Sequence, residues 1–192
     1  MHLNLSNTNL VIALIAIALI LIITVAIYQN HRRNTAAQLR ERFGSEYDRA
    51  VLEQGSESRA QAHLQARESR VEHLHLRDLT PAERERSEAD WQSIQSRFVD
   101  HPKGAVLEAD ELVSSLMNAR GYPVADFDQR AADISVHHPR VVDSYRSAHA
   151  VAVRLNSDEA TTEDLRAAMI QYRTLFDELL QLRSPNQIEH AA

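Results

Sequence analysis

The chain has 192 residues, with 27 Asp or Glu against 21 Lys or Arg, so its formal net charge at neutral pH is −6. It contains no cysteine, which excludes disulfides, thiolate metal ligands and cysteine nucleophiles. The basic residues are interleaved with a larger number of acidic ones, so the composition excludes the basic surface that a nucleic-acid partner requires.

The first predicted element is a membrane-spanning helix. Nineteen consecutive residues from Leu10 to Tyr28 include no charge, no Gly and no Pro. A helix of about 20 apolar residues at ~1.5 Å rise per residue matches the ~30 Å hydrocarbon core of a bilayer. A cleaved signal peptide is the alternative, but it requires a basic start, a shorter apolar run and a small-residue cleavage site. We therefore expect a retained single-pass transmembrane helix over 10–28, in contact with lipid, after a short tail over 1–9.

The orientation of this helix follows from its flanks. The preceding residues include no Lys or Arg, whereas Arg32, Arg33, Arg40 and Arg42 follow it closely. Positively charged flanks stay on the cytoplasmic side. We expect a protein of the bacterial inner (plasma) membrane with its C-terminal domain in the cytoplasm; a periplasmic domain is the alternative.

Residues 29–77 are polar and rich in Glu, Gln, Arg and Ala. Gly44 is a typical residue to end the helix that continues from the span. A thin apolar seam runs from Leu64 to Leu74, but Arg67 lies where a coiled coil requires an apolar residue. We interpret this segment as a juxtamembrane helical stalk.

Residues 78–183 have the pattern of an all-α bundle, because no segment alternates apolar and polar residues as a half-buried strand does. Thr80-Pro81-Ala82-Glu83 combines three preferences for a helix start. The last helix has the longest apolar face, from Leu165 to Leu180, and each large side chain buried there contributes roughly 1.5–3 kcal/mol. Helices are expected over about 80–100, 103–120, 126–135, 139–155 and 161–183, followed by a flexible tail over 184–192.

The sequence has no recognisable catalytic, cofactor or metal-binding motif. His73 and His75 would point to different faces of a helix, and no two histidines lie four residues apart. The four glycines are spaced too widely for a phosphate-binding loop or a serine nucleophile elbow. Only the tertiary structure could bring His63, His138 and His149 together as a metal site, and their spacing does not indicate one. We expect no enzymatic activity, no cofactor and no metal.

One polar cluster is the candidate interaction surface. Arg130 with Asp133, and Asp143 with Arg146, are three residues apart and can form ion pairs on a helix. Because arginine side chains bind carboxylates and phosphates well, one hypothesis is a recognition surface for a partner or a small anionic ligand. The alternative is a polar corner that fixes the crossing of two helices. The cluster consists of Arg130, Asp133, His138, Arg140, Asp143, Arg146 and His149.

Several short motifs also support a resemblance. They are LRERFGSEYDR (39–49), RFVD (97–100), ARGYPV (119–124), QRAAD (129–133), HPRVV (138–142) and TTEDLR (161–166). In this order, over residues 39–180, they resemble an uncharacterised family of bacterial membrane-anchored or exported helical proteins. The resemblance implies a bacterial source. The family has no assigned activity, so no functional residue is transferred from it.

Together these observations predict a membrane-anchored, non-enzymatic interaction module with a protein partner. Two alternatives remain open. The first is a ligand-binding or metal-binding protein, or an enzyme, that uses the cluster at 130–149. The second is a structural envelope protein that forms homo-oligomers through the stalk.

Overall fold

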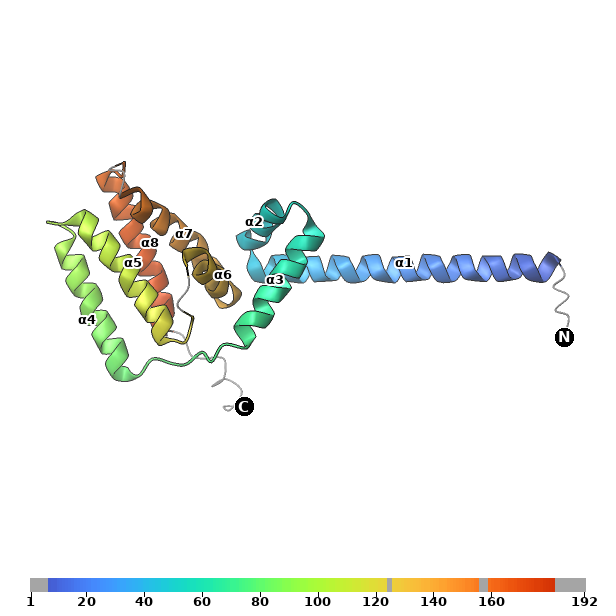
Figure 1. The fold of residues 1–192 in the computed structure, drawn as a ribbon, viewed down its shortest axis with the longest axis horizontal. Helices are drawn as coiled ribbons and strands as arrows, with labels where there is room; N and C mark the ends of the chain where they lie inside the picture. The colour runs from blue at the N-terminus through green and yellow to red at the C-terminus, as the bar shows by residue number, and fades with distance from the viewer. Residues whose placement is uncertain (1–6, 124–125, 156–158, 182–192) are drawn as a thin grey trace.

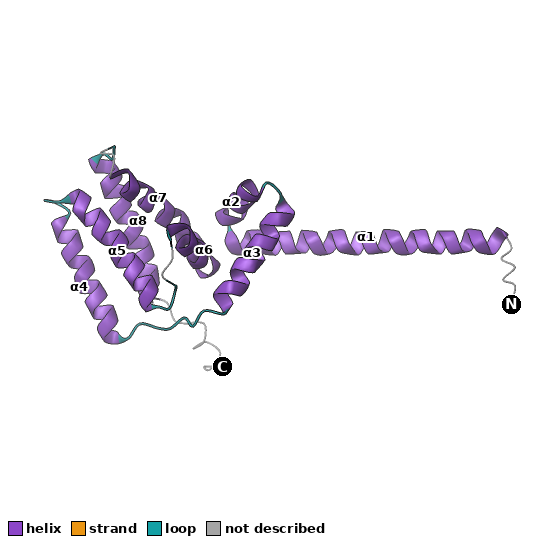
Figure 2. Ribbon diagram, viewed as in Figure 1, coloured by secondary structure: helices purple, strands orange, loops and turns teal. Residues whose placement is uncertain are grey.

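The computed structural model describes residues 7–123, 126–155 and 159–181. These residues form eight α-helices and no strand, which confirms the all-α prediction (Figure 2). The predicted tail over 184–192 and the first six residues of the chain lie outside them. The helices are α1 (Asn7–Phe43), α2 (Ser45–Gln54), α3 (Glu57–Glu72), α4 (Pro81–Arg97), α5 (Pro102–Ala119), α6 (Phe127–His137), α7 (Pro139–Arg154) and α8 (Thr162–Gln181).

Helix α1 is the longest helix and extends away from the other seven as a rod (Figure 1). Its large apolar side chains between Ile12 and Ile27 are 54–65% exposed where they are described. Judged on the described residues alone, no helix has the length and hydropathy required to cross a membrane. Part of the predicted span falls outside the side chains that are described, namely Leu10, Val11, Ala13, Val25 and Tyr28.

The segment predicted as a juxtamembrane helical stalk over 29–77 contains the end of α1, α2 and α3. The chain turns at Gly44, and α2 then ends at Gly55, which adopts a left-handed conformation with φ of 68°. Helices α2 and α3 therefore fold back on each other and on the end of α1. We call residues 39–72 the N-terminal corner. Its apolar core consists of Leu39, Phe43, Tyr47, Ala50, Ala60, Leu64 and Val71, together with Val136 from α6.

The remaining helices form a bundle with its own core. Helix α8 packs between α5 and α7, and α4 covers the outer side of α5 (Figure 1). The rings of Trp91 and Phe176 stack in this core with centroids 4.9 Å apart. The predicted start of α4 is confirmed, since Thr80 Oγ1 accepts a hydrogen bond from Glu83 N and the Glu83 carboxylate accepts one from Thr80 N.

The N-terminal corner meets the bundle where α3 packs against α6 and α2 approaches α7. Val136 is the buried apolar residue that α6 contributes to the core of the corner. Buried charged and polar side chains account for much of the rest of this junction. The candidate site lies there.

Candidate functional site

Glu46, in the first turn of α2, is a buried carboxylate that binds arginines from three helices. Its side chain is 1% exposed. Arg67 of α3 donates from Nη1 to Oε2 at 3.2 Å, and Arg146 of α7 donates from Nε to Oε1 at 3.0 Å and from Nη2 to Oε2 at 3.2 Å. Arg49 Nε lies 3.3 Å from Oε1. Charge-assisted bonds of this kind tie the corner to the bundle.

Arg67 is the most deeply buried of these arginines, with 4% of its surface exposed. Its Nη1 also donates to Ser135 Oγ of α6 at 2.9 Å. Its Nε is buried and has no hydrogen-bond partner among the residues that the structure describes. Burial lowers the pKa of Arg67; Glu46 opposes this effect, and the charge of Arg146 adds to it. The Arg67 guanidinium is therefore only partly compensated.

Asp133 of α6 is a second buried carboxylate at the same junction. It is 1% exposed and accepts hydrogen bonds from Arg70 Nε at 3.1 Å and Arg70 Nη2 at 2.6 Å. Gln129 Nε2 donates to the same oxygen at 2.8 Å. A second arginine of α3 is thereby fixed against α6.

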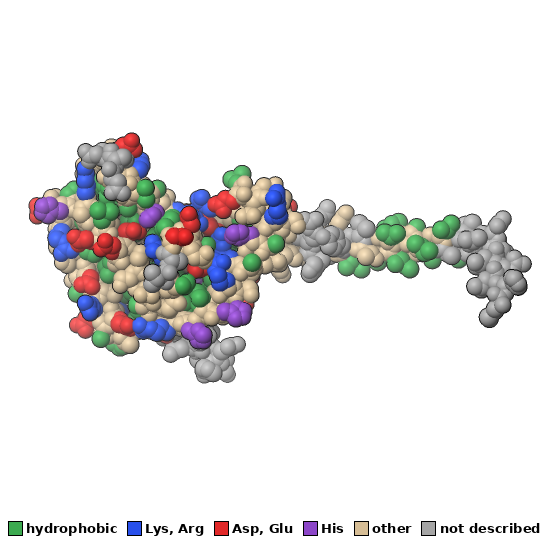
Figure 3. Space-filling view, in the orientation of Figure 1, with side chains coloured by type: hydrophobic (Ala, Val, Ile, Leu, Met, Phe, Trp, Pro, Cys, Tyr) green, Lys and Arg blue, Asp and Glu red, His purple; other side chains and the backbone are tan. Residues whose placement is uncertain are grey.

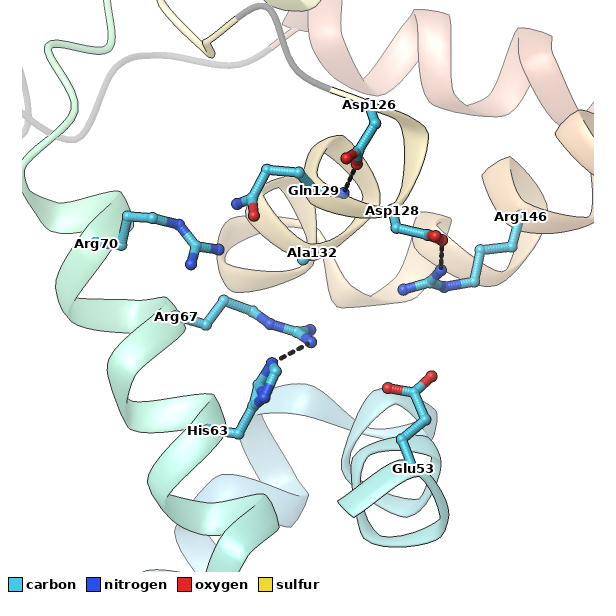
Figure 4. Close-up of a pocket in the computed structure, with 9 residues that line it drawn as sticks. All are labelled: Glu53, His63, Arg67, Arg70, Asp126, Asp128, Gln129, Ala132 and Arg146. Carbon is cyan, nitrogen blue, oxygen red and sulfur yellow. Dashed lines mark hydrogen bonds and ion pairs between the residues drawn. The ribbon is translucent and has the colours of Figure 1, made fainter.

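Arg67, Arg70 and Arg146 border a cavity of about 430 Å³ between α2, α3, α6 and α7. In Figure 4, the guanidinium groups of Arg67 and Arg70 reach into it from α3, and that of Arg146 reaches in from α7. The carboxylate of Glu53 faces them from α2. The lining residues are Glu53, His63, Arg67, Arg70, Asp126, Asp128, Gln129, Ala132 and Arg146.

The lining contains three arginines and three carboxylates, so it has both signs of charge in equal number. The visible face of the helical domain likewise mixes acidic and basic side chains, whereas α1 displays apolar ones (Figure 3). Asp126 caps α6 by accepting a bond from Gln129 N at 2.8 Å, and Asp128 Oδ1 lies 3.8 Å from Arg146 Nη1. The cavity is suited to a small polar ligand rather than to an apolar one.

A separate polar network lies inside the bundle around Asp110 of α5. Tyr172 Oη donates to its Oδ1 at 2.9 Å, and His149 Nδ1 lies 3.3 Å from the same atom. Burial raises the pKa of Asp110, but the bonds with His149 and Tyr172 outweigh it and leave the pKa lowered. The His149 ring stacks on Phe127 at 3.7 Å. This network joins α5, α7 and α8.

The structure distributes the predicted cluster over several places. Asp133 and Arg146 belong to the junction beside the cavity. Arg130 Nε donates to Tyr145 Oη at 3.3 Å, and His149 belongs to the network around Asp110. Elsewhere, His138 Nδ1 lies 3.2 Å from Glu178 Oε1, Asp143 accepts a bond from Ser45 Oγ at 2.5 Å, and Arg140 is exposed.

The three histidines considered for a metal site also have different surroundings. His63 lies beside Gln54 and Arg67, whereas His138 faces Glu178 and His149 faces Asp110. Within the described parts of the chain, no group of three or more His, Asp or Glu side chains is arranged to hold a metal ion.

The cluster predicted from the sequence omitted Glu46, Glu53, Arg67 and Arg70, and also the lining residues Asp126 and Asp128. One local signal was present, because Arg67 interrupts an apolar seam and a charge at such a position needs a buried partner. Glu46 has no comparable signal, since an acidic residue in the first turn of a helix is ordinary.

Comparison of the chain with models of protein families, with curated proteins and with solved structures gives no match. The resemblance to a bacterial family therefore stays a prediction.

Proposed function

We propose that this protein is a single-pass membrane protein of the bacterial inner membrane whose helical domain is a non-enzymatic binding module. Its binding site is the cavity between the N-terminal corner and the bundle. The observation that carries the proposal is the convergence of Arg67, Arg70 and Arg146 on one cavity from two helices. Guanidinium groups held by buried carboxylates are pre-organised to bind an oxyanion.

The membrane anchor is supported by sequence and helix geometry together. The uncharged run from Leu10 to Tyr28 belongs to the continuous helix α1. A helix that is apolar on all sides is covered either by protein or by lipid. The same helix ends in the buried residues Leu39 and Phe43, so no flexible linker separates the anchor from the corner. The arginines that follow the run favour a cytoplasmic domain.

The anchor is tested by introducing charge into the run of the full-length protein. Lys at the centre of a span costs about 2.5–3.5 kcal/mol. We expect Ile17→Lys combined with Leu21→Lys to release the protein from membranes during alkaline extraction. Leu52→Lys, at an exposed leucine of α2, is the control and should leave the protein in the membrane. Extraction of the unmodified protein by alkali would contradict the proposal.

Its orientation is tested by a reporter at the C-terminus. A reporter that is active only in the cytoplasm should give signal, and one that is active only in the periplasm should not. The reverse result would place the domain in the periplasm.

The binding site is tested by native mass spectrometry of the full-length protein released from membranes in mild detergent. We expect a bound mass that is lost in Arg70→Gln and kept in Arg86→Gln, an exposed arginine of α4 outside the cavity. A bound mass unaffected by Arg70→Gln, or no bound mass, would contradict a ligand site in this cavity. The same spectra report the oligomeric state, and a homo-oligomer without ligand would favour the structural alternative.

A further inference from the structure

We infer that the cavity takes a small zwitterion in which a phosphate and an ammonium group are joined by a short spacer. This inference rests on the proposed function and names the ligand class of the same site. Free aminoalkyl phosphates and the headgroup of phosphatidylethanolamine share this chemistry. Its phosphate and its ammonium group would each have partners among the residues that line the cavity.

Three arginines line the cavity. Arg67, Arg70 and Arg146 are held there by two buried carboxylates, those of Glu46 and Asp133. A guanidinium group has five N–H donors, and these carboxylates use only some of them. Asp133 uses Nε and Nη2 of Arg70, so Nη1 of Arg70 remains for a ligand.

A phosphate group fits these three arginines better than a single hydrogen-bond acceptor would. Arginines from two helices converge on the cavity, and a phosphate can accept bonds from several guanidinium groups at once. The buried Nε of Arg67 has no partner among the described residues, and burial lowers the pKa of this arginine. An anion beside Arg67 would relieve that cost.

Three carboxylates line the same cavity. They belong to Glu53, Asp126 and Asp128. Asp126 caps α6, and Asp128 lies near Arg146. The Glu53 carboxylate is turned toward the cavity (Figure 4). Three carboxylates oppose a polyanion such as a nucleotide and attract an ammonium group. Glu53 is the residue that we assign to the ammonium group.

The test uses the full-length protein in detergent micelles and calorimetric titration at low salt. The probes are O-phosphoethanolamine, inorganic phosphate and ethanolamine. We expect O-phosphoethanolamine to bind at least about tenfold more tightly than either fragment, as expected when two charge-assisted contacts act together. Glu53→Gln should weaken O-phosphoethanolamine about tenfold and leave phosphate unchanged, whereas Arg70→Gln should weaken both. Glu57→Gln, an exposed change in the first turn of α3, is the matched control and should alter neither.

Nanodiscs distinguish the two sources of the ligand. If phosphatidylethanolamine in the disc displaces O-phosphoethanolamine and phosphatidylcholine does not, the ligand is the lipid headgroup. If neither lipid displaces it, the ligand is a free aminoalkyl phosphate. Both outcomes support the inference.

Two outcomes would overturn the inference. If phosphate binds as tightly as O-phosphoethanolamine and Glu53→Gln has no effect, the cavity is a simple anion site and the proposed binding module survives. If no probe binds while a native bound mass still depends on Arg70, the ligand belongs to another class and again only the inference fails. The proposed function fails separately, through the membrane extraction and mass measurements described above.

Discussion

Replacement of Glu46 by Gln tests whether the buried carboxylate holds the N-terminal corner to the bundle. The side chain keeps its shape, but it loses its charge and offers one acceptor oxygen in place of two. The Arg67 side chain, 5% exposed, then remains beside it as a buried cation, whereas the partly buried Arg146, 16% exposed, still has Asp128 at 3.8 Å. The substitution therefore acts at the point where α2, α3 and α7 meet.

The expected cost follows from this burial. Removing one partner of a buried ion pair destabilises a protein by about 3–5 kcal/mol, because the remaining charge is uncompensated. Arg49 is 45% exposed, so its share of the interaction is small. We expect Glu46→Gln to lower the free energy of unfolding by about 3 kcal/mol, which for a chain of this size is a fall of roughly 10 °C in Tm.

Thermal unfolding of the full-length protein in detergent, followed by circular dichroism, measures this effect. Glu41→Gln, at an exposed glutamate near the end of α1, is the matched control and should change Tm little. In the double variant with Arg67→Met the losses should be less than additive, since the two residues interact directly. A Tm for Glu46→Gln within about 2 °C of the control would refute the reasoning.

Three further variants test other parts of the fold. Gly121→Ala should destabilise the protein by more than about 1 kcal/mol, because φ is +95° and the new Cβ would lie 2.4 Å from His75 O; a Tm equal to that of the unmodified protein would contradict this. Thr80→Ala removes the cap of α4 and should cost about 1 kcal/mol in urea unfolding, whereas an unchanged midpoint would argue against the capping box. Burial lowers the pKa of His138 although Glu178 opposes this, so the unfolded chain binds the proton more readily. Stability should therefore rise with pH up to about 6.5, and His138→Gln should flatten that rise; an equal slope in both proteins would exclude His138 as its source.

Local sequence signals predicted most of the helices. The Thr-Pro-Ala-Glu start of α4 and the apolar face of α8 both appear in the structure where the pattern placed them. These features depend on residues within a few positions of one another, so they can be predicted from the sequence alone. Residues 39–72 were predicted to be helical, but the packing of α2 and α3 on each other was not predicted, because the same helices can pack in more than one way. The observed packing depends on contacts with α6, such as that of Arg70 with Asp133, which lies 63 residues further along the chain.

The candidate site was harder to predict for the same reason. Pairing by spacing suggested Arg130 with Asp133 and Asp143 with Arg146, but Asp133 is held by Arg70 and Arg146 by Glu46. Both observed partners come from the N-terminal corner, 63 and 100 residues away. An ion pair within one helix is available locally, but the carboxylates of Asp133 and Glu46 are each 1% exposed, and a buried carboxylate is constrained more strongly by its partners on a second helix.

The cavity lies between the N-terminal corner, which includes the end of α1, and the bundle. Glu53, Arg67 and Arg70 belong to the N-terminal corner, whose core includes the last turns of α1, whereas Asp128 and Arg146 belong to the bundle. A ligand in the cavity therefore contacts both parts at a junction that is held largely by buried polar groups. If the proposed ligand binds there, it stabilises the arrangement that contains the complete site and would fix the bundle relative to α1. Glu46 binds Arg67 and Arg146 at the same junction, so we expect its replacement to alter both the stability of the fold and the geometry of the proposed binding site.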